Sequence, residues 1–163
     1  MPFSREEALA ALTSLNPAPI FLDAYRMQRL PENLDFHIGA PAEFFLAPAT
    51  QDAYTQGRFV PLLDDGCFSA VLMFDPATRE LREIELESPQ AAPTPFRHWQ
   101  HYLAHLMLRI GESIDEVERL RRIAALVGFE HAALFFDFLA RSEGLRGAAW
   151  STARDEFLAG ASA

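Results

Sequence analysis

The chain has 163 residues, of which half are apolar, and a formal net charge of -9. This length and composition suit one globular domain with a packed core and exclude a disordered protein. All 14 basic residues are Arg, so the chain has no lysine for a P-loop, a Schiff base or a Ser-Lys dyad. The negative charge also disfavours DNA or RNA as a direct ligand.

The N-terminal part of the sequence predicts helices. Ser4 and Glu7 form a capping-box pattern before a helix that we expect to end near Leu15. Apolar residues at helical spacing predict a second helix over residues 20–30, which Pro31 would end. Residues 31–57 contain many Pro and Gly residues, and the sequence assigns no element to them.

The next part predicts an antiparallel β-meander. Asp64-Asp65-Gly66 lies between two apolar runs, which is typical of a tight hairpin turn. With Asp65-Gly66 as a two-residue loop, Pro61 would face Ala70 at a non-hydrogen-bonded position, so the first strand would lie at an edge of the sheet. The middle strand is apolar on both faces, which predicts that both are covered. The expected strands are residues 59–63, 67–74 and 79–87.

The rest of the chain has the 3.6-residue period of helices. The expected helices cover residues 97–110, a segment capped by Ser113 and Glu116 and ended by Gly128, residues 129–141, and a short segment at 152–158. We therefore predict an α+β fold in a single domain over 1–163. Its parts are N-terminal helices with an irregular segment (1–57), a small twisted antiparallel sheet (58–87) and a layer of three to four helices (96–159).

Negative charge is densest in the predicted sheet. Residues 58–87 contain seven acids and three Arg, whereas residues 88–163 contain nine acids and eight Arg. Such a surface would attract a basic protein partner through complementary charge. The same acids are also what a solvated sheet face needs for solubility, and the sequence leaves that interpretation open. The proposed partner-binding residues are Asp64, Asp65, Asp75, Glu80, Glu83, Glu85 and Glu87.

Three histidines, His98, His101 and His105, share one stripe of a predicted helix. His98 and His105 are about 10.5 Å apart along a helix axis, too far to ligate one ion together. We therefore expect a solvated or partner-contacting stripe and no metal site. Cys67 begins an apolar strand without a nucleophile motif around it, so a small buried side chain is expected there. The sequence predicts no catalytic residue, no cofactor and no enzyme.

Four phenylalanines, Phe129, Phe135, Phe136 and Phe138, are concentrated in one predicted helix. In a monomer this aromatic area would be core. The same side chains could form the interface of an adaptor or a homodimer, which is the alternative function that the sequence leaves open.

The environment of the protein follows from what the sequence lacks. A single cysteine cannot form an internal disulfide, which favours a reducing compartment. The N-terminal residues are acidic and do not form a signal peptide, and no apolar run approaches the ~20 residues of a membrane span. We expect a cytoplasmic protein that does not enter a membrane.

The meander resembles the SUKH superfamily. The resemblance lies in the run Arg58 to Gly66, the apolar strand 67–74, the turn at Asp75-Pro76 and the acidic third strand, and the step Leu30-Pro31-Glu32 is similar to a family feature. An aromatic-led helix over 96–106 also fits. The resemblance implies a bacterial immunity protein that binds and neutralises a cognate toxin. With the acidic sheet, we expect a noncatalytic protein that occludes the toxin's basic surface. Fungal relatives are scaffold-like regulators of cell-wall synthesis.

Overall fold

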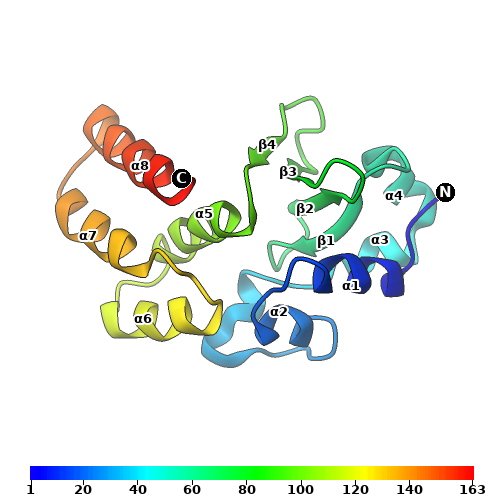
Figure 1. Cartoon of the computed structure of the whole chain (residues 1–163), viewed down its shortest axis with the longest axis horizontal. Coiled ribbons are helices and arrows are strands. Elements are labelled where there is room, and N and C mark those ends of the chain that lie inside the picture. The colour runs from blue at the N-terminus through cyan, green and yellow to red at the C-terminus, as the bar shows by residue number, and fades with distance from the viewer. The chain divides into compact units, whose positions relative to one another are not determined.

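A computed structural model describes residues 1–163, and their contacts divide the chain into two compact units, Met1–Phe96 and Arg97–Ala163. The first unit contains a four-stranded antiparallel sheet with short helices, and the second contains four helices (Figure 1). The α+β class with a C-terminal helical layer is confirmed. The assignment of 1–163 to a single domain stays a prediction. None of the helices combines the length and the apolar composition that crossing a bilayer requires.

The first two helices differ in how well the sequence predicted them. Helix α1 spans Arg5–Thr13, and the capping box is confirmed, because Ser4 and Glu7 each accept a hydrogen bond from the other's backbone amide. Helix α2 spans only Pro19–Asp23, so the predicted length was wrong. Beyond it, Tyr25 turns inward and its hydroxyl donates to the Leu62 carbonyl at 2.5 Å. A short isolated helix is only marginally stable, so this tertiary contact decides the backbone conformation after Asp23 although the apolar residues have helical spacing.

Residues 31–57 form three short helical segments. These are the 3-10 turns of η1 (Pro31–Phe36), helix α3 (Ala42–Leu46) and helix α4 (Pro48–Thr55). In η1, Glu32 and Asn33 both have a φ of 56°, which is outside the right-handed helical region. Because the helix is interrupted there, its residues show no helical period in the sequence. Gln51 of α4 is fully buried, and its amide group binds both the N–H and the carbonyl of Phe3.

The strands are β1 (Val60–Asp64), β2 (Ala70–Asp75), β3 (Glu80–Glu85) and β4 (Thr94–Phe96), paired in that order. Every residue of β2 is buried, which confirms that both of its faces are covered. The position of β1 at an edge, which Pro61 predicted, is also confirmed. The sequence did not predict β4.

The loop between β1 and β2 is longer than predicted. Asp65 holds it by accepting hydrogen bonds from the Ser69 amide at 3.0 Å and from the Ser69 hydroxyl. These side-chain bonds offer the backbone an alternative to continued strand pairing. The observed pairs are Asp64 with Val71 and Pro61 with Met73, where a two-residue loop requires Cys67 and Ala70.

The core of the N-terminal unit lies between the sheet and the short helices. Phe44 of α3 packs with Phe59, Val71 and Met73, and the Phe68 ring meets the Phe44 ring edge-on at 5.0 Å. Helix α1 lies against β1 and buries Ala8 and Leu12. Because aromatic and aliphatic groups from the short helices fill this core, the sheet is fixed relative to the loops at its ends.

The helices of the second unit are α5 (Trp99–Gly111), α6 (Val117–Leu126), α7 (Ala132–Ser142) and α8 (Gly147–Ala161). The predicted capping box of Ser113 and Glu116 was wrong. The Ser113 hydroxyl does not cap α6 but donates to the Ile110 carbonyl at the end of α5. Gly128 ends α6 as predicted, since its φ of 69° lets Gly128 and Phe129 bond back to the last turn. Helix α8 is much longer than the predicted segment 152–158.

Candidate functional site

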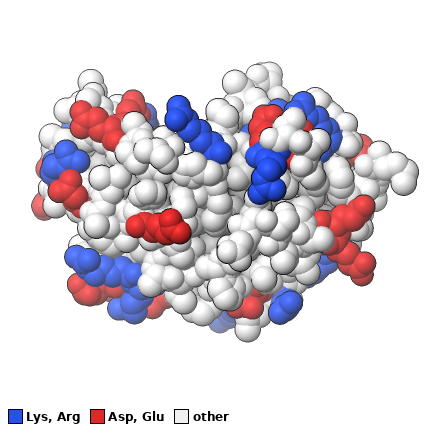
Figure 2. All heavy atoms as spheres, in the orientation of Figure 1, with Lys and Arg blue, Asp and Glu red and all other residues white.

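The seven predicted acids do not form one surface. Asp75 and Glu80 pair with each other at one end of the sheet, whereas Asp64 ends β1 and Glu85 pairs with Ala70 at the other end. On the face drawn in Figure 2, red acidic atoms of the N-terminal unit occur in separate groups, with blue or white atoms between them. The predicted continuous patch therefore has to be divided into two groups.

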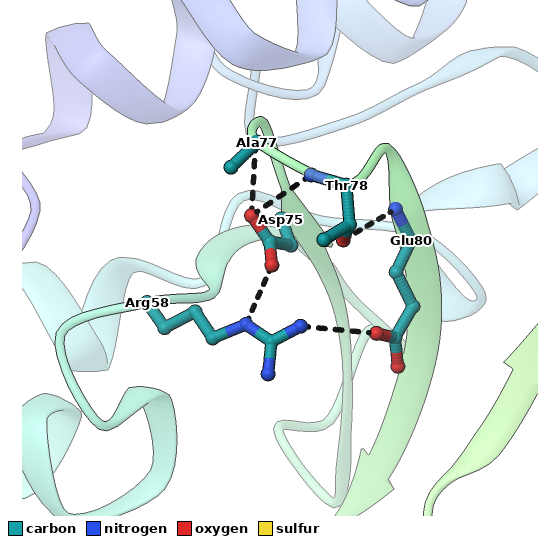
Figure 3. Close-up of polar contacts among 5 residues, drawn as sticks. All are labelled: Arg58, Asp75, Ala77, Thr78 and Glu80. Atoms are coloured by element: carbon teal, nitrogen blue, oxygen red, sulfur yellow. Dashed lines mark hydrogen bonds and ion pairs between the residues drawn. The ribbon is translucent and has the colours of Figure 1, made fainter.

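At the first end, one arginine of the chain pairs with both carboxylates and offsets one of their two charges (Figure 3). Arg58 Nε donates to Asp75 at 2.5 Å, and Nη2 donates to Glu80 at 3.3 Å. Asp75 is only 2% exposed and also accepts from the Ala77 and Thr78 amides. The hydrogen bond from Arg58 is the main reason that the pKa of Asp75 falls to about 2. Placing Asp75 in a free acidic surface was therefore wrong, whereas Glu80 pairs with Arg58 and stays partly exposed.

At the second end, Asp64 and Asp65 lie in different environments. Burial raises the pKa of Asp64 to about 6; a hydrogen bond from the Gly66 amide opposes this, and the nearby Asp65 and Glu43 carboxylates add to it. Burial acts against ionisation of Asp65 as well, but hydrogen bonds from Ser69, Ala70 and Cys67 together outweigh it and lower the pKa. The fold therefore holds the Asp64 carboxylate in an unfavourable place, mainly because it is buried and further because Asp65 and Glu43 repel it.

The end of β3 lies beside this loop. The Leu86 amide donates to the Ser69 carbonyl at 2.8 Å, which holds the two segments together. Glu85 and Glu87 are exposed, and Glu83 is half-buried. The pairing of β2 with β3 places Glu83 and Glu85 on one face and Ile84 on the other, as the alternation predicted. We call Glu43, Asp64, Asp65, Glu85 and Glu87 the acidic end.

An exposed aromatic residue, Phe36, adjoins the acidic end. Its side chain is 70% exposed, and its backbone lies directly against Gly66, where an added Cβ would come within 2.5 Å of the Phe36 carbonyl carbon. Large exposed aromatic groups are frequent anchors of protein interfaces. Sequence reasoning missed Phe36, because no local pattern distinguishes it from the many buried phenylalanines.

The histidine stripe is only partly solvated. His98 caps α5, where its Nδ1 accepts from the His101 amide, and its Nε2 lies 3.2 Å from the Ser162 carbonyl. Burial lowers the pKa of His105 to about 4, and the charges of His101, Arg109 and Arg154 lower it further. All three histidines are half-buried, so the stripe serves packing within the C-terminal unit. No three His, Cys, Asp or Glu side chains of the chain converge as a metal site.

Cys67 is exposed, so the prediction of a buried thiol was wrong. The physical reason is the longer loop, which delays β2 until Ala70. The Cys67 Sγ lies 3.3 Å from the Ser69 hydroxyl and 3.5 Å from an Asp65 oxygen. The thiol thus belongs to the hydrogen-bonded loop at the acidic end.

The four phenylalanines are mainly core, and they do not all lie in one helix as predicted, because α7 begins at Ala132 and Phe129 precedes it. Phe129, Phe135 and Phe138 are at most 5% exposed, and each ring packs against Phe157 at centroid distances of 6.5, 5.7 and 5.3 Å. Phe136 is half-buried, with the Arg121 guanidinium 4.4 Å from its ring centroid. Three of the four proposed interface residues are therefore used inside the C-terminal unit.

The raised pKa of Asp64, which is due mainly to burial and further to the Asp65 and Glu43 charges, predicts that Asp64→Asn stabilises the protein near neutral pH. The folded-state pKa of about 6 exceeds the ordinary value of 3.8, so stability falls as pH rises through this window. Asn keeps an oxygen for the Gly66 amide without the charge. We expect a gain of about 1–2 kcal/mol at pH 7.5, after allowing for solvent screening, and almost none near pH 4.

Urea unfolding of both proteins at the two pH values measures this difference. Glu87→Gln is the matched control, since Glu87 is exposed at the same end and its charge should matter little to stability. An Asp64→Asn variant with the same gain at both pH values would contradict the argument that the ionised, buried carboxylate is destabilising.

Comparison with known proteins found no match. No family model matches it, and neither a curated protein nor a solved structure does.

Proposed function

We propose that this chain is a noncatalytic binding protein that docks a basic protein partner on the acidic end. The observation that carries the proposal is the exposed Phe36, which rests on Gly66 beside carboxylates that repel one another. An apolar anchor with charged groups around it combines the two features that protein interfaces use for affinity and selectivity.

The two features have different roles in the proposed complex. Burying the Phe36 ring removes a large apolar area from water, which slows dissociation. The carboxylates of Glu85, Glu87 and Asp65 attract a basic partner over a distance comparable to the Debye length, which speeds association. Asp75 and Glu80 contribute less to this attraction, because Arg58 offsets one of their two negative charges and Asp75 is buried.

The resemblance to the SUKH superfamily suggests what the partner is. We infer a basic toxin domain, which the chain would neutralise by covering its positive surface, as a bacterial immunity protein in the cytoplasm does. The alternative, an adaptor or homodimer that associates through residues 129–139, has less support, because Phe129, Phe135 and Phe138 are core residues.

The test uses the purified chain and the protein encoded by the neighbouring gene. We expect saturable binding whose association rate falls with salt, and Phe36→Ala should weaken it by about 10- to 100-fold. Val117→Ala is the control, since Val117 is an exposed apolar residue in the other unit. Isothermal titration and stopped-flow fluorescence supply the affinity and the rate.

Charge reversal at Glu85 and Glu87 tests the second feature, and it should slow association without changing the fold. If Phe36→Ala and the double charge reversal both leave affinity and rate unchanged, the acidic end is not the binding surface.

A further inference from the structure

A pocket of about 560 Å³ lies on the N-terminal unit, within the size range of small-molecule sites, and shares only Glu85 with the acidic end. It is formed by α4, β3 and the segment before β4. Its walls are mixed, with aromatic and apolar side chains beside polar and charged ones, and two guanidinium groups line it. The residues that matter for the argument are Tyr54, Phe59, Ile84, Pro93, Arg58 and Arg82.

Arg82 is unusual among the arginines of this chain. Its guanidinium carbon lies 3.4 Å from the Phe59 ring centroid, its Nε is shielded from solvent without a hydrogen-bond partner, and it makes no ion pair. The chain has 23 acids for 14 basic residues, so acids for pairing are abundant. A half-buried cation without a counter-ion and a buried N–H without an acceptor both carry a free-energy cost.

Arg58 adds a second guanidinium at the same ring, with its central carbon 4.6 Å from the Phe59 centroid. Its contacts with Asp75 and Glu80 use Nε and Nη2 and fix its orientation, while Nη1 has no partner in Figure 3. The pocket thus presents one guanidinium held rigidly by carboxylates and one that no group of the chain neutralises. The planar fork of Arg matches the two oxygens of a carboxylate.

We propose that this pocket binds a small carboxylic acid with an apolar body. The carboxylate meets the guanidinium of Arg82, and the apolar body lies along Tyr54, Ile84 and Pro93. Glu85 also lines the pocket, and its negative charge acts more strongly against a phosphate dianion than against a carboxylate monoanion. A carboxylate on an apolar molecule is the anion that suits this combination of walls and charges.

The binding test uses the full chain and defined probes. 3-Phenylpropionate and octanoate supply a carboxylate on an apolar body, 3-phenylpropionamide is the neutral analogue, and inorganic phosphate is the competing anion. We expect saturable binding of the two acids with a Kd of about 0.1–1 mM. NMR shifts should concentrate at the Arg82 Nε–H and at Phe59 and Ile84. The amide and phosphate should bind at least about tenfold more weakly.

The variants assign the binding to Arg82. Arg82→Gln should lose about tenfold or more in affinity, and Arg82→Lys should retain part of it. Arg79→Gln is the matched control, because Arg79 adjoins the same strand, stacks 5.7 Å from the Phe74 centroid and does not line the pocket. If Arg82→Gln does not fold, the NMR shifts of the wild-type chain and the Arg82→Lys titration still decide the result.

Four results would overturn the proposal. They are no saturable binding of either acid up to about 10 mM, equal affinity for the neutral amide, tighter binding of phosphate, and unchanged affinity in the Arg82 variants. None of these results depends on a protein partner, so the pocket and the acidic end are tested independently.

Discussion

Replacing Phe135 with alanine is expected to lower the free energy of unfolding of the C-terminal unit by about 4 kcal/mol. Phe135 is fully buried and its ring contacts those of Phe129, Phe136 and Phe157. Its edge also lies 3.3 Å from where a Cβ on Gly111 would be, so the neighbouring helix is closely packed. Truncation would leave a cavity that these rings cannot fill without moving.

Tryptophan fluorescence is the suitable measurement, because both tryptophans, Trp99 and Trp150, belong to this unit. Phe136→Ala is the control on the same helix. Phe136 is half-buried, and we expect it to cost about 1 kcal/mol.

Phe135→Ala also distinguishes a core role of Phe135 from a role in a dimer interface. A core role predicts a loss of stability that is independent of protein concentration. Phe135→Ala would contradict it by leaving the unfolding midpoint unchanged at low concentration while converting a dimer into a monomer in light scattering.

Gly66→Ala is expected to destabilise the N-terminal unit by about 3 kcal/mol. Gly66 has a φ of 88°, which L-residues rarely adopt, and a Cβ would lie 2.5 Å from the Phe36 carbonyl carbon and 2.6 Å from its oxygen. Since both obstructing atoms are backbone, the loop or η1 has to move. The variant should therefore also displace Phe36 and weaken binding of the partner.

Gly57→Ala is the matched control for the backbone angle alone. Gly57 has a φ of 65°, and the nearest atom to an added Cβ is at 3.6 Å, an ordinary contact. We expect a cost of about 1 kcal/mol there. Hydrogen exchange of the β2 amides measures both variants, and equal costs would show that the close approach to Phe36 has no energetic importance.

The sequence predicted best where a short segment determines its own structure. Ser4 and Glu7 cap each other three residues apart, and Gly128 ends α6 through bonds to the turn before it. Ser113 has the same local pattern as Ser4, yet its hydroxyl bonds to the preceding helix. Local rules give the possible partners of a side chain, and the surrounding chain decides among them.

The candidate site was harder to predict, because its properties depend on residues far apart in the sequence. Asp75 looked like a surface acid until Arg58, seventeen residues away, was placed on it. The acidic end combines the β1–β2 loop with Glu43 of α3, which the sequence placed in an unassigned segment. Phe36 stands out because its side chain is exposed, and Arg82 because its side chain is half-buried. A linear pattern does not report the exposed fraction of single residues.

Both outer strands of the sheet contain a proline, Pro61 in β1 and Pro95 in β4. Proline has no amide hydrogen to offer a further strand, and part of the open side of β1 is already taken by the bridge between Asp64 and Gly39. The sheet is thereby guarded against growing by β-augmentation, whether into fibrils or onto a partner's backbone. Whatever docks on this unit has to recognise it through side chains.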